Sequence, residues 1–342
     1  MSQGIPPVAV LGAGTWGTAL ALHLGRLGRS VRLWGRDATL VKAIRESGEN
    51  ARYLPGVAVP SAIRVTADFA EALDRVDIAI VAVPSSFVAR VVEPMADAVP
   101  QQAVVISATK GLEPREGRRM SWLLNELLPG RAVAVLSGPS FAREVALGLP
   151  TALVIASGDD GLSQRLQRSL SAPAFRLYTN RDVVGVEIAG ALKNVVAIAT
   201  GLADGLELGE NARAALITRG LAEIVRLGVA LGAQPATFLG LAGLGDLVLT
   251  CTGSLSRNRA LGREVARGRR VAEVEGGTPT IAEGVRTVSS ALKLARGVGC
   301  RMPICQEVSE VLFEAKPVRQ ALHALLSREP RPEEEMAWDP RG

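Results

Sequence analysis

The sequence predicts an α/β domain followed by an all-α domain. Over about the first 180 residues, short apolar runs alternate with helical patterns, which is typical of strand–helix–strand units around a parallel sheet. After Asn180 only helical patterns continue. A chain of 342 residues is also too long for one ordinary core. We therefore expect an α/β domain over residues 1–180, an all-helical domain over 181–328, and a loose, charged, Pro-rich tail over 329–342.

The expected elements follow from these patterns in order. Strands are expected at Val8–Leu11, Val31–Trp34, Ile63–Val65, Ile78–Val83, Val104–Ser107, Ala132–Leu136, Leu153–Ala156 and Phe175–Tyr178. Helices of the first domain are expected at Thr18–Leu27, Leu40–Glu46, Phe69–Leu73, Val88–Ala96, Ser121–Leu127, Phe141–Leu147 and Leu162–Leu170. Those of the second are expected at Asp182–Gly201, Ala212–Leu231, Ala236–Leu239, Arg257–Arg267, Ala282–Arg296, Cys305–Glu314 and Val318–Leu326.

A glycine motif, G-x-G-x-x-G, joins the first expected strand to the helix after it. Gly12 allows a tight turn, Gly14 lets a pyrophosphate approach the backbone, and Gly17 lets the helix pack closely on the strand. The helix N-terminus then faces the anion. A tight turn alone could carry the same letters, but the flanking strand, helix and second strand favour a Rossmann-like dinucleotide-binding domain.

The end of the second strand predicts which dinucleotide is preferred. An acid at this point usually holds the ribose hydroxyls of NAD, but Gly35 lies there and Arg36 follows. Because a nearby arginine accommodates the 2′-phosphate of NADP, we favour NADP. Asp37 keeps NAD open as the alternative.

Three further loops follow expected parallel strands, at the edge where such sheets bind ligands. They are Val83–Phe87, Ser107–Gly111 and Ser137–Ser140. This topology alone places Lys110 at the cofactor mouth, unless it is an ordinary loop lysine. Ser140 is expected to cap the helix that begins at Phe141.

The Asp182–Gly201 segment reads as a helix that is apolar almost all round, which marks it as buried. Its one charge between Glu187 and Asp204 is Lys193. Small residues such as Ala189 and Gly190 share the face of Lys193, leaving room for another group to approach. Desolvation disfavours a charged amine, so Lys193 is a candidate proton carrier, the alternative being a lysine that reaches solvent from a helix edge.

Composition narrows the possible chemistry. Only five of the 39 basic residues are lysine, and an amine that can lose its proton is what arginine cannot supply. Two histidines and three cysteines without metal-ligand spacing argue against zinc or another metal and fit a reducing compartment. Scattered charges, 4% aromatic residues and interrupted apolar runs predict no nucleic-acid or integral membrane contact. With no signal peptide in view, we expect a cytoplasmic protein.

A second cluster lies in the helical part. Gly243-Leu244-Gly245-Asp246 precedes a helix start with Ser256, Arg257 and Asn258. Backbone amides at a helix N-terminus and a guanidinium together suit a phosphate, although a capped surface helix would read the same.

Together these motifs resemble the soluble, bacterial-type NAD(P)-dependent glycerol-3-phosphate dehydrogenases. G-A-G-T-W-G, S-A-T-K-G, S-G-P-S-F-A, A-L-K-N, G-L-G-D-L-x-x-T-C and S-R-N occur in that order over about residues 8 to 290. The resemblance implies hydride transfer between NAD(P)H and dihydroxyacetone phosphate, giving sn-glycerol 3-phosphate for phospholipid synthesis. It also suggests a homodimer.

The resemblance implies a role for each matching residue. Lys193 would be the proton carrier and Lys110 the second catalytic lysine. Both would contact substrate, together with Gly138, Ser140, Asp246, Ser256, Arg257 and Asn258. The cofactor would contact Gly12, Gly14, Thr15, Trp16, Gly17, Arg36, Lys110, Ala142, Arg257, Ile281 and Glu283. Thr15 stands where serine is common and keeps the hydroxyl.

Two other functions remain open from the residues. A related two-domain hydroxyacid dehydrogenase also places a lysine on an inter-domain helix, but its substrates are carboxylates, whereas the S-R-N helix start favours a phosphate. A non-catalytic NADP-sensing protein would need no proton carrier, so Lys110 and Lys193 together argue against it.

Overall fold

The computed structural model describes residues 6–277 and 282–329, and these separate into two compact units. The first unit contains the chain up to Thr109 together with Met120–Arg181. The second contains Lys110–Arg119 and the chain from Asp182 onward. The expected tail beyond Glu329 and the expected cofactor residue Ile281 lie outside the described residues.

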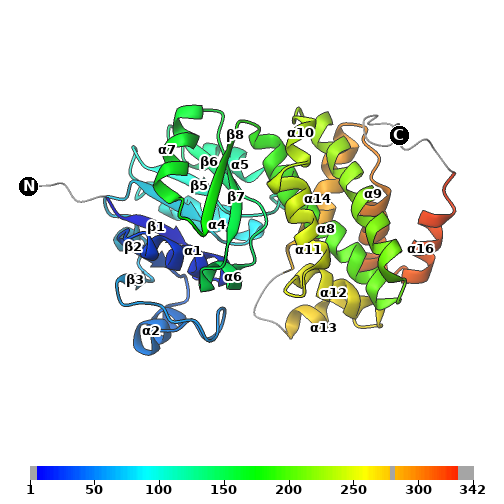
Figure 1. Cartoon of the computed structure of the whole chain (residues 1–342), viewed down its shortest axis with the longest axis horizontal. Coiled ribbons are helices and arrows are strands. Elements are labelled where there is room, and N and C mark those ends of the chain that lie inside the picture. The colour runs from blue at the N-terminus through cyan, green and yellow to red at the C-terminus, as the bar shows by residue number, and fades with distance from the viewer. Residues whose placement is uncertain (1–5, 278–281, 330–342) are drawn as a thin grey trace, which may run out of the picture. The chain divides into compact units, whose positions relative to one another are not determined.

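One sheet of eight strands, in the order β3-β2-β1-β4-β5-β6-β7-β8, forms the centre of the first unit (Figure 1). The sheet is parallel from β3 to β6, but β7 pairs antiparallel with β6, and β8 runs parallel to β7. The expectation of a wholly parallel sheet was therefore wrong at this edge. The strands are β1 Val8–Leu11, β2 Val31–Trp34, β3 Ile63–Thr66, β4 Ile78–Val81, β5 Val104–Ser107, β6 Val133–Ser137, β7 Thr151–Ala156 and β8 Phe175–Asn180.

Apolar side chains cover both faces of this sheet. Val8 and Val10 of β1 belong to one core cluster, whereas Ala9 and Leu11 belong to the other, because alternate residues of a strand face opposite sides. Two buried faces explain why the strands read as continuous apolar runs. The helices are α1 Thr15–Arg26, α2 Ala38–Ser47, α3 Phe69–Leu73, α4 Val88–Val92, α5 Met120–Leu127, α6 Ala142–Leu147 and α7 Asp160–Leu170, with short 3₁₀ turns η1 Ser85–Phe87 and η2 Glu93–Met95.

Helices make up the second unit. The element that sequence reasoning missed most clearly is α11, which follows a single π-turn and carries Asp246. The helices are α8 Val183–Gly205, α9 Gly209–Ala230, α10 Pro235–Phe238, α11 Asp246–Thr252, α12 Arg257–Ala266, α13 Val271–Gly276, α14 Glu283–Gly297, α15 Pro303–Phe313 and α16 Val318–Leu326, and the π-turn is η3 Leu241–Gly245.

Helix α8 runs through this unit with α9, α12 and α14 packed around it (Figure 1). Nineteen of its 23 residues are buried, from Gly185 to Ala203. Its length and composition would suffice to cross a membrane, as would those of Pro235–Thr252, so these two apolar runs are less interrupted than we expected. However, 89% of the most apolar window of α8 is buried inside the structure, so α8 is a core helix.

The segment Lys110–Arg119 corrects the expected domain division. It was expected in the first domain, but it forms a hairpin within the second unit, closed by the Leu112–Arg119 bridge and the hydrogen bond from Glu113 N to Arg118 O (2.9 Å). Leu112 is fully buried in the core around α8, and burial of this side chain holds the hairpin in the second unit. We call this segment the Lys110 hairpin.

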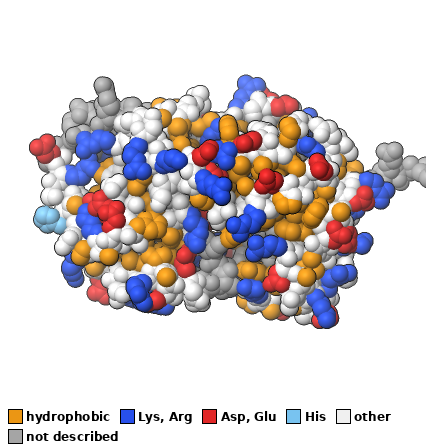
Figure 2. Space-filling view, turned by 180° about the vertical axis from the view of Figure 1, so that it is seen from behind, with side chains coloured by type: hydrophobic (Ala, Val, Ile, Leu, Met, Phe, Trp, Pro, Cys, Tyr) orange, Lys and Arg blue, Asp and Glu red, His pale blue; other side chains and the backbone are white. Residues whose placement is uncertain are grey.

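On the molecular face in Figure 2, basic and acidic side chains are intermingled, and neither sign forms a continuous field.

Candidate functional site

Lys193 lies at the centre of a buried polar cluster in the second unit. Its Nζ donates to Asp246 Oδ1 at 2.8 Å and to Thr250 Oγ1 at 2.7 Å. Lys193 is 6% exposed and Asp246 only 1%. Because Asp246 and Thr250 are four residues apart on α11, their side chains share one helix face and converge on the amine.

Lys110 approaches the same carboxylate from the other side. Its Nζ donates to Asp246 Oδ2 at 2.8 Å, so one aspartate bridges two lysines. Burial lowers the pKa of Lys193 to about 8, a shift that the Asp246 charge opposes and the Lys110 charge reinforces. An amine with this pKa exchanges a proton readily near neutral pH.

A chain of three hydrogen bonds connects the backbone of Lys110 to the start of α14. Asn194 Nδ2 donates to Lys110 O at 3.3 Å, and Asn258 Nδ2 donates to Asn194 Oδ1 at 2.9 Å. Gly284 N, in turn, donates to Asn258 Oδ1 at 3.0 Å. The side chains of Asn194 and Asn258 are both buried, so these hydrogen bonds provide the partners that water cannot supply there.

The start of α12 has the expected form. Ser256 is the N-cap residue, and its Oγ accepts from Arg259 N at 3.3 Å. Arg257 is the first helical residue and is exposed, whereas Ser256 and Asn258 are buried. The guanidinium of Arg257 beside the N-terminal N–H groups of α12 remains a candidate phosphate-binding site.

The glycine loop of the first unit leaves backbone N–H groups open at the start of α1. Gly12 has a φ of +125°, and a Cβ there would come within 2.6 Å of Ala82 O. A Cβ on Gly17 would lie 1.9 Å from Gly12 O, whereas Gly14 faces open space. No side chain caps the N-terminus of α1, and the buried Trp16 Nε1 lacks a partner among the described residues. Open amides beside an open Gly14 fit the pyrophosphate of a dinucleotide.

After the end of β2, Arg36 and Asp37 have different environments. A Cβ on Gly35 would meet Ala13 Cβ at 2.9 Å, so this position cannot hold an acidic side chain without displacement. Asp37 caps α2, accepting from Thr39 N at 3.0 Å, and lies 3.3 Å from Arg52. Arg36 is exposed, with its guanidinium 5.7 Å from the ring centre of Phe87.

The remaining expected site residues fall in both units. Gly138 and Ser140 follow β6 in the first unit, and Ser140 Oγ donates to Gly138 O at 3.0 Å. The expected cap was wrong, because α6 begins at Ala142 with Phe141 as its N-cap residue. Glu283 is the first residue of α14 in the second unit.

Two residues of the cluster were missed from the sequence. Thr250, which contacts Lys193, lies four residues after Asp246 in the T-C motif. Asn194 directly follows Lys193 and orients the Lys110 backbone. The signal for Thr250 was the i, i+4 spacing, but it required recognising that Asp246 begins a helix.

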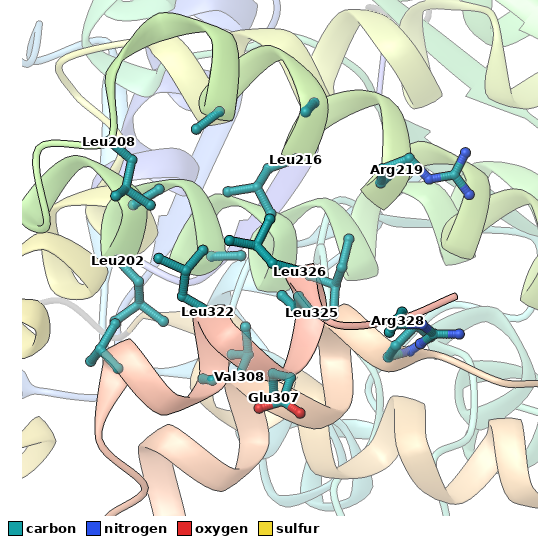
Figure 3. Close-up of a pocket in the computed structure, with 18 of the residues that line it drawn as sticks. Leu202, Leu208, Leu216, Arg219, Glu307, Val308, Leu322, Leu325, Leu326 and Arg328 are labelled. Carbon is teal, nitrogen blue, oxygen red and sulfur yellow. The ribbon is translucent and has the colours of Figure 1, made fainter. Parts of the chain in front are cut away.

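A separate pocket of about 470 Å³ lies among α8, α9, α15 and α16 (Figure 3). Leucines such as Leu202, Leu216 and Leu322 line it, with Arg219 and Arg328 toward one end. None of the cluster residues lines this pocket. Over residues 6–277 and 282–329, no group of three or more His, Cys, Asp or Glu side chains could hold a metal ion.

A glycine loop of the nucleotide-binding type and a buried Lys–Asp–Lys cluster fit a nicotinamide-dependent dehydrogenase, an oxidoreductase. Comparison with known families agrees and is more specific. Residues 7–163 match the N-terminal part of NAD-dependent glycerol-3-phosphate dehydrogenase, and residues 182–323 match its C-terminal part. The chain belongs to the NAD-dependent glycerol-3-phosphate dehydrogenase family.

Individual relatives match over nearly the whole chain. An NAD(P)+ glycerol-3-phosphate dehydrogenase of Geobacter sp. (strain M21) is 48% identical over 324 residues, which is 94% of this chain and 97% of the relative. That of Moorella thermoacetica is 48% identical, over 97% of this chain and 98% of the relative. The crystal structure of the Coxiella burnetii glycerol-3-phosphate dehydrogenase is 41% identical with a TM-score of 0.91, covering 94% of this chain and 99% of that one. The predicted family and two-part fold are confirmed.

Proposed function

We propose that this chain interconverts dihydroxyacetone phosphate and sn-glycerol 3-phosphate by hydride transfer with NADP or NAD. The observation that carries the proposal is the buried Lys193 amine, held by Asp246 and Thr250 with its pKa lowered to about 8. Relatives named as glycerol-3-phosphate dehydrogenases support the substrate. The product is a building block for phospholipid synthesis.

The residues divide the chemical work. In the reducing direction Lys193 donates a proton to the C2 oxygen of the substrate, and Lys110 polarises that oxygen. Asp246 fixes both ammonium groups in place, since it accepts from each at 2.8 Å. Arg257 and the N-terminus of α12 hold the phosphate, with Asn258 beside them, and Gly138 and Ser140 complete the substrate contacts.

The glycine loop is the place for the cofactor. Gly12, Gly14 and Gly17 would hold the pyrophosphate at the N-terminus of α1, with Thr15, Trp16 and Ala142 as the further cofactor contacts of the first unit. When bound, the nicotinamide supplies or accepts the hydride. Lys110, Arg257 and Glu283 are the proposed cofactor contacts of the second unit, and Ile281 is proposed from the resemblance alone.

NADP is the proposed preference. Asp37, the carboxylate that could favour NAD, already caps α2 and pairs with Arg52. Arg36 is exposed beside it and suits a 2′-phosphate.

Replacing Lys193 tests the proposed chemistry. Lys193→Met should lower kcat for dihydroxyacetone phosphate by roughly 10²–10⁴-fold, because the proton donor is lost. The dissociation constant for NADPH should stay within a few-fold of the wild-type value. Near-normal turnover in this variant would show that another group carries the proton.

Testing the wild-type protein against several substrates separates the alternatives. NADPH oxidation with dihydroxyacetone phosphate, and none with a panel of 2-keto acids, supports the proposal. Preference for a keto acid would favour the hydroxyacid dehydrogenase. Cofactor binding without oxidation of any substrate would favour the sensor.

We further propose that the protein is a cytoplasmic homodimer. Light scattering after size-exclusion chromatography tests the dimer directly, and a mass of about one chain would exclude it.

A further inference from the structure

The Lys110 hairpin is tied to α8 at both ends. At one end Asn194 Nδ2 of α8 donates to Lys110 O at 3.3 Å, and the Lys110 amine contacts Asp246. At the other end Arg119 Nη1 donates to Glu187 Oε2 at 2.8 Å. Glu187 and Asn194 are seven residues apart on α8, so the two ties lie about 10 Å apart along the helix axis.

Between these ends the hairpin is held against α14. Ser290 Oγ donates to Glu113 O at 3.3 Å, and Lys293 Nζ donates to Arg115 O at 2.7 Å. Gly117 has a φ of +74°, and a Cβ there would lie 3.1 Å from Leu294 Cγ. The hairpin also stiffens itself, since Glu113 accepts from Arg115 N and Glu116 N, each at 2.8 Å.

In the Arg119–Glu187 pair the carboxylate is buried and the guanidinium is 26% exposed. The Glu187 side chain is only 3% exposed and is followed on α8 by Ile188 and Ala189, both buried. Burying a carboxylate is costly, and a well-packed apolar pair is often at least as stable as a buried ion pair. What the ion pair adds over an apolar contact is a fixed orientation of the hairpin.

We propose that Arg119 and Glu187 are positioning residues for the reaction: their ion pair fixes the Lys110 hairpin so that the Lys110 amine stays on Asp246. This inference rests on the proposed function. It extends the machinery to two residues that need not touch substrate.

The proposal has a consequence for the proton carrier. The charged and titratable groups facing Lys193 are Asp246 and Cys251 of α11 and Lys110 of the hairpin, with the neutral Thr250 beside them. Of these, Lys110 lowers the pKa of Lys193. If the hairpin loosens and Lys110 moves away, the pKa of Lys193 rises, and the alkaline fall of kcat/KM moves to higher pH.

A double-mutant cycle tests this coupling. Glu187→Gln should lower kcat/KM for dihydroxyacetone phosphate by about 10- to 100-fold, the cost of a misplaced catalytic group. In a Lys110→Met background the same change should lower it by less than twofold, because the side chain being positioned is already gone. Independent, multiplicative losses in the two backgrounds would overturn the proposal, as would an unshifted alkaline limb in Glu187→Gln.

Three further measurements separate positioning from folding. Arg119→Lys, which can keep the ion pair, should recover most of the activity lost in Arg119→Met. Glu307→Gln, which neutralises another ion pair of the second unit with Lys316, should leave kcat/KM unchanged. Hydrogen exchange at Gly117 N should accelerate in Glu187→Gln, a readout independent of catalysis. A wild-type chain inactive on dihydroxyacetone phosphate would refute the proposed function, whereas unchanged exchange would refute the tie itself.

Discussion

At the scale of single residues, the site depends on the shared carboxylate of Asp246. Burial favours release of a proton from Lys193, and the Lys110 ammonium on the same carboxylate adds to this effect, whereas the Asp246 charge opposes it. Arginine could not do this, because its guanidinium stays charged. The burial that makes Lys193 reactive also requires Thr250 and Asp246 as hydrogen-bond partners.

This arrangement predicts a pH profile. Reduction needs protonated Lys193, so kcat/KM for dihydroxyacetone phosphate should fall as pH rises through about 8. Asp246 raises the pKa of Lys193, so Asp246→Asn should move this fall to lower pH as well as lower the rate. Initial rates from pH 6 to 10 would show it, and an unshifted or upward-shifted fall would contradict the assignment.

Arg36 gives a second test at this scale. Arg36→Ala should raise the KM for NADPH by roughly 10- to 100-fold, because a charge-assisted contact to the 2′-phosphate contributes about 1.5–3 kcal/mol. The KM for NADH should barely change, and Arg90→Ala provides a control on a nearby arginine that also lies over Phe87. Equal effects on both cofactors would remove the basis for the NADP preference.

At the scale of elements, glycine contacts bring α8 and α12 together. A Cβ on Gly201 would lie 2.1 Å from Arg259 O, and one on Gly262 would lie 2.2 Å from Ile198 O. Such contacts let the two backbones approach closely and place Asn258 within hydrogen-bonding distance of Asn194. At this crossing, therefore, a small residue of α8 serves the packing of one helix against another.

Alanine at this crossing should therefore destabilise the protein. Gly201→Ala and Gly262→Ala should each cost about 1–3 kcal/mol of unfolding free energy, because backbone atoms must move apart. Gly297→Ala, at the exposed end of α14 with open space around it, should be neutral or stabilising by about 0.4–1 kcal/mol. Urea unfolding of the three variants measures both effects, and equal costs at all three sites would argue against the contact explanation.

Much at this scale could be predicted from the sequence. The strands and long helices follow from apolar runs and their periodicity, and the glycine loop follows from its spacing. The antiparallel β7 could not be predicted, because a strand buried on both faces reads alike in either direction. The helix α11 was hidden by Gly243 and Gly245, which normally mark a loop, and with it the position of Thr250.

At the scale of the molecule, the buried carboxylate of Glu223 affects stability and lies apart from the Lys193 cluster. Glu223 of α9 is 2% exposed and accepts from Ile304 N at 2.7 Å and Cys305 N at 3.3 Å. Burial raises the pKa of Glu223 to about 7 despite these bonds. Glu223 lines the apolar pocket shown in Figure 3. The sequence did not predict that Glu223 is buried, because its burial depends on the packing of α15.

Glu223 should make stability depend on pH. A carboxyl whose pKa is higher in the folded state contributes fully below its unfolded value near 4.5, and the contribution is lost as pH rises through about 7. The difference in unfolding free energy between wild type and Glu223→Gln should shift by roughly 2–4 kcal/mol between pH 5 and 8, in favour of the variant at pH 8. Urea unfolding at these two pH values tests it. A difference that does not change with pH would show that Glu223 is ionised in both states.

The placement of the Lys110 hairpin has a consequence for how the chain folds. The boundary between units is crossed three times along the sequence, after Thr109, after Arg119 and after Arg181. During synthesis the hairpin therefore emerges more than 80 residues before α8, its packing partner, is complete. Leu112 stays without its core until then, which raises the contact order of the second unit and slows its assembly. A gene fragment that begins at Asp182 would encode a helical unit lacking one of its own pieces.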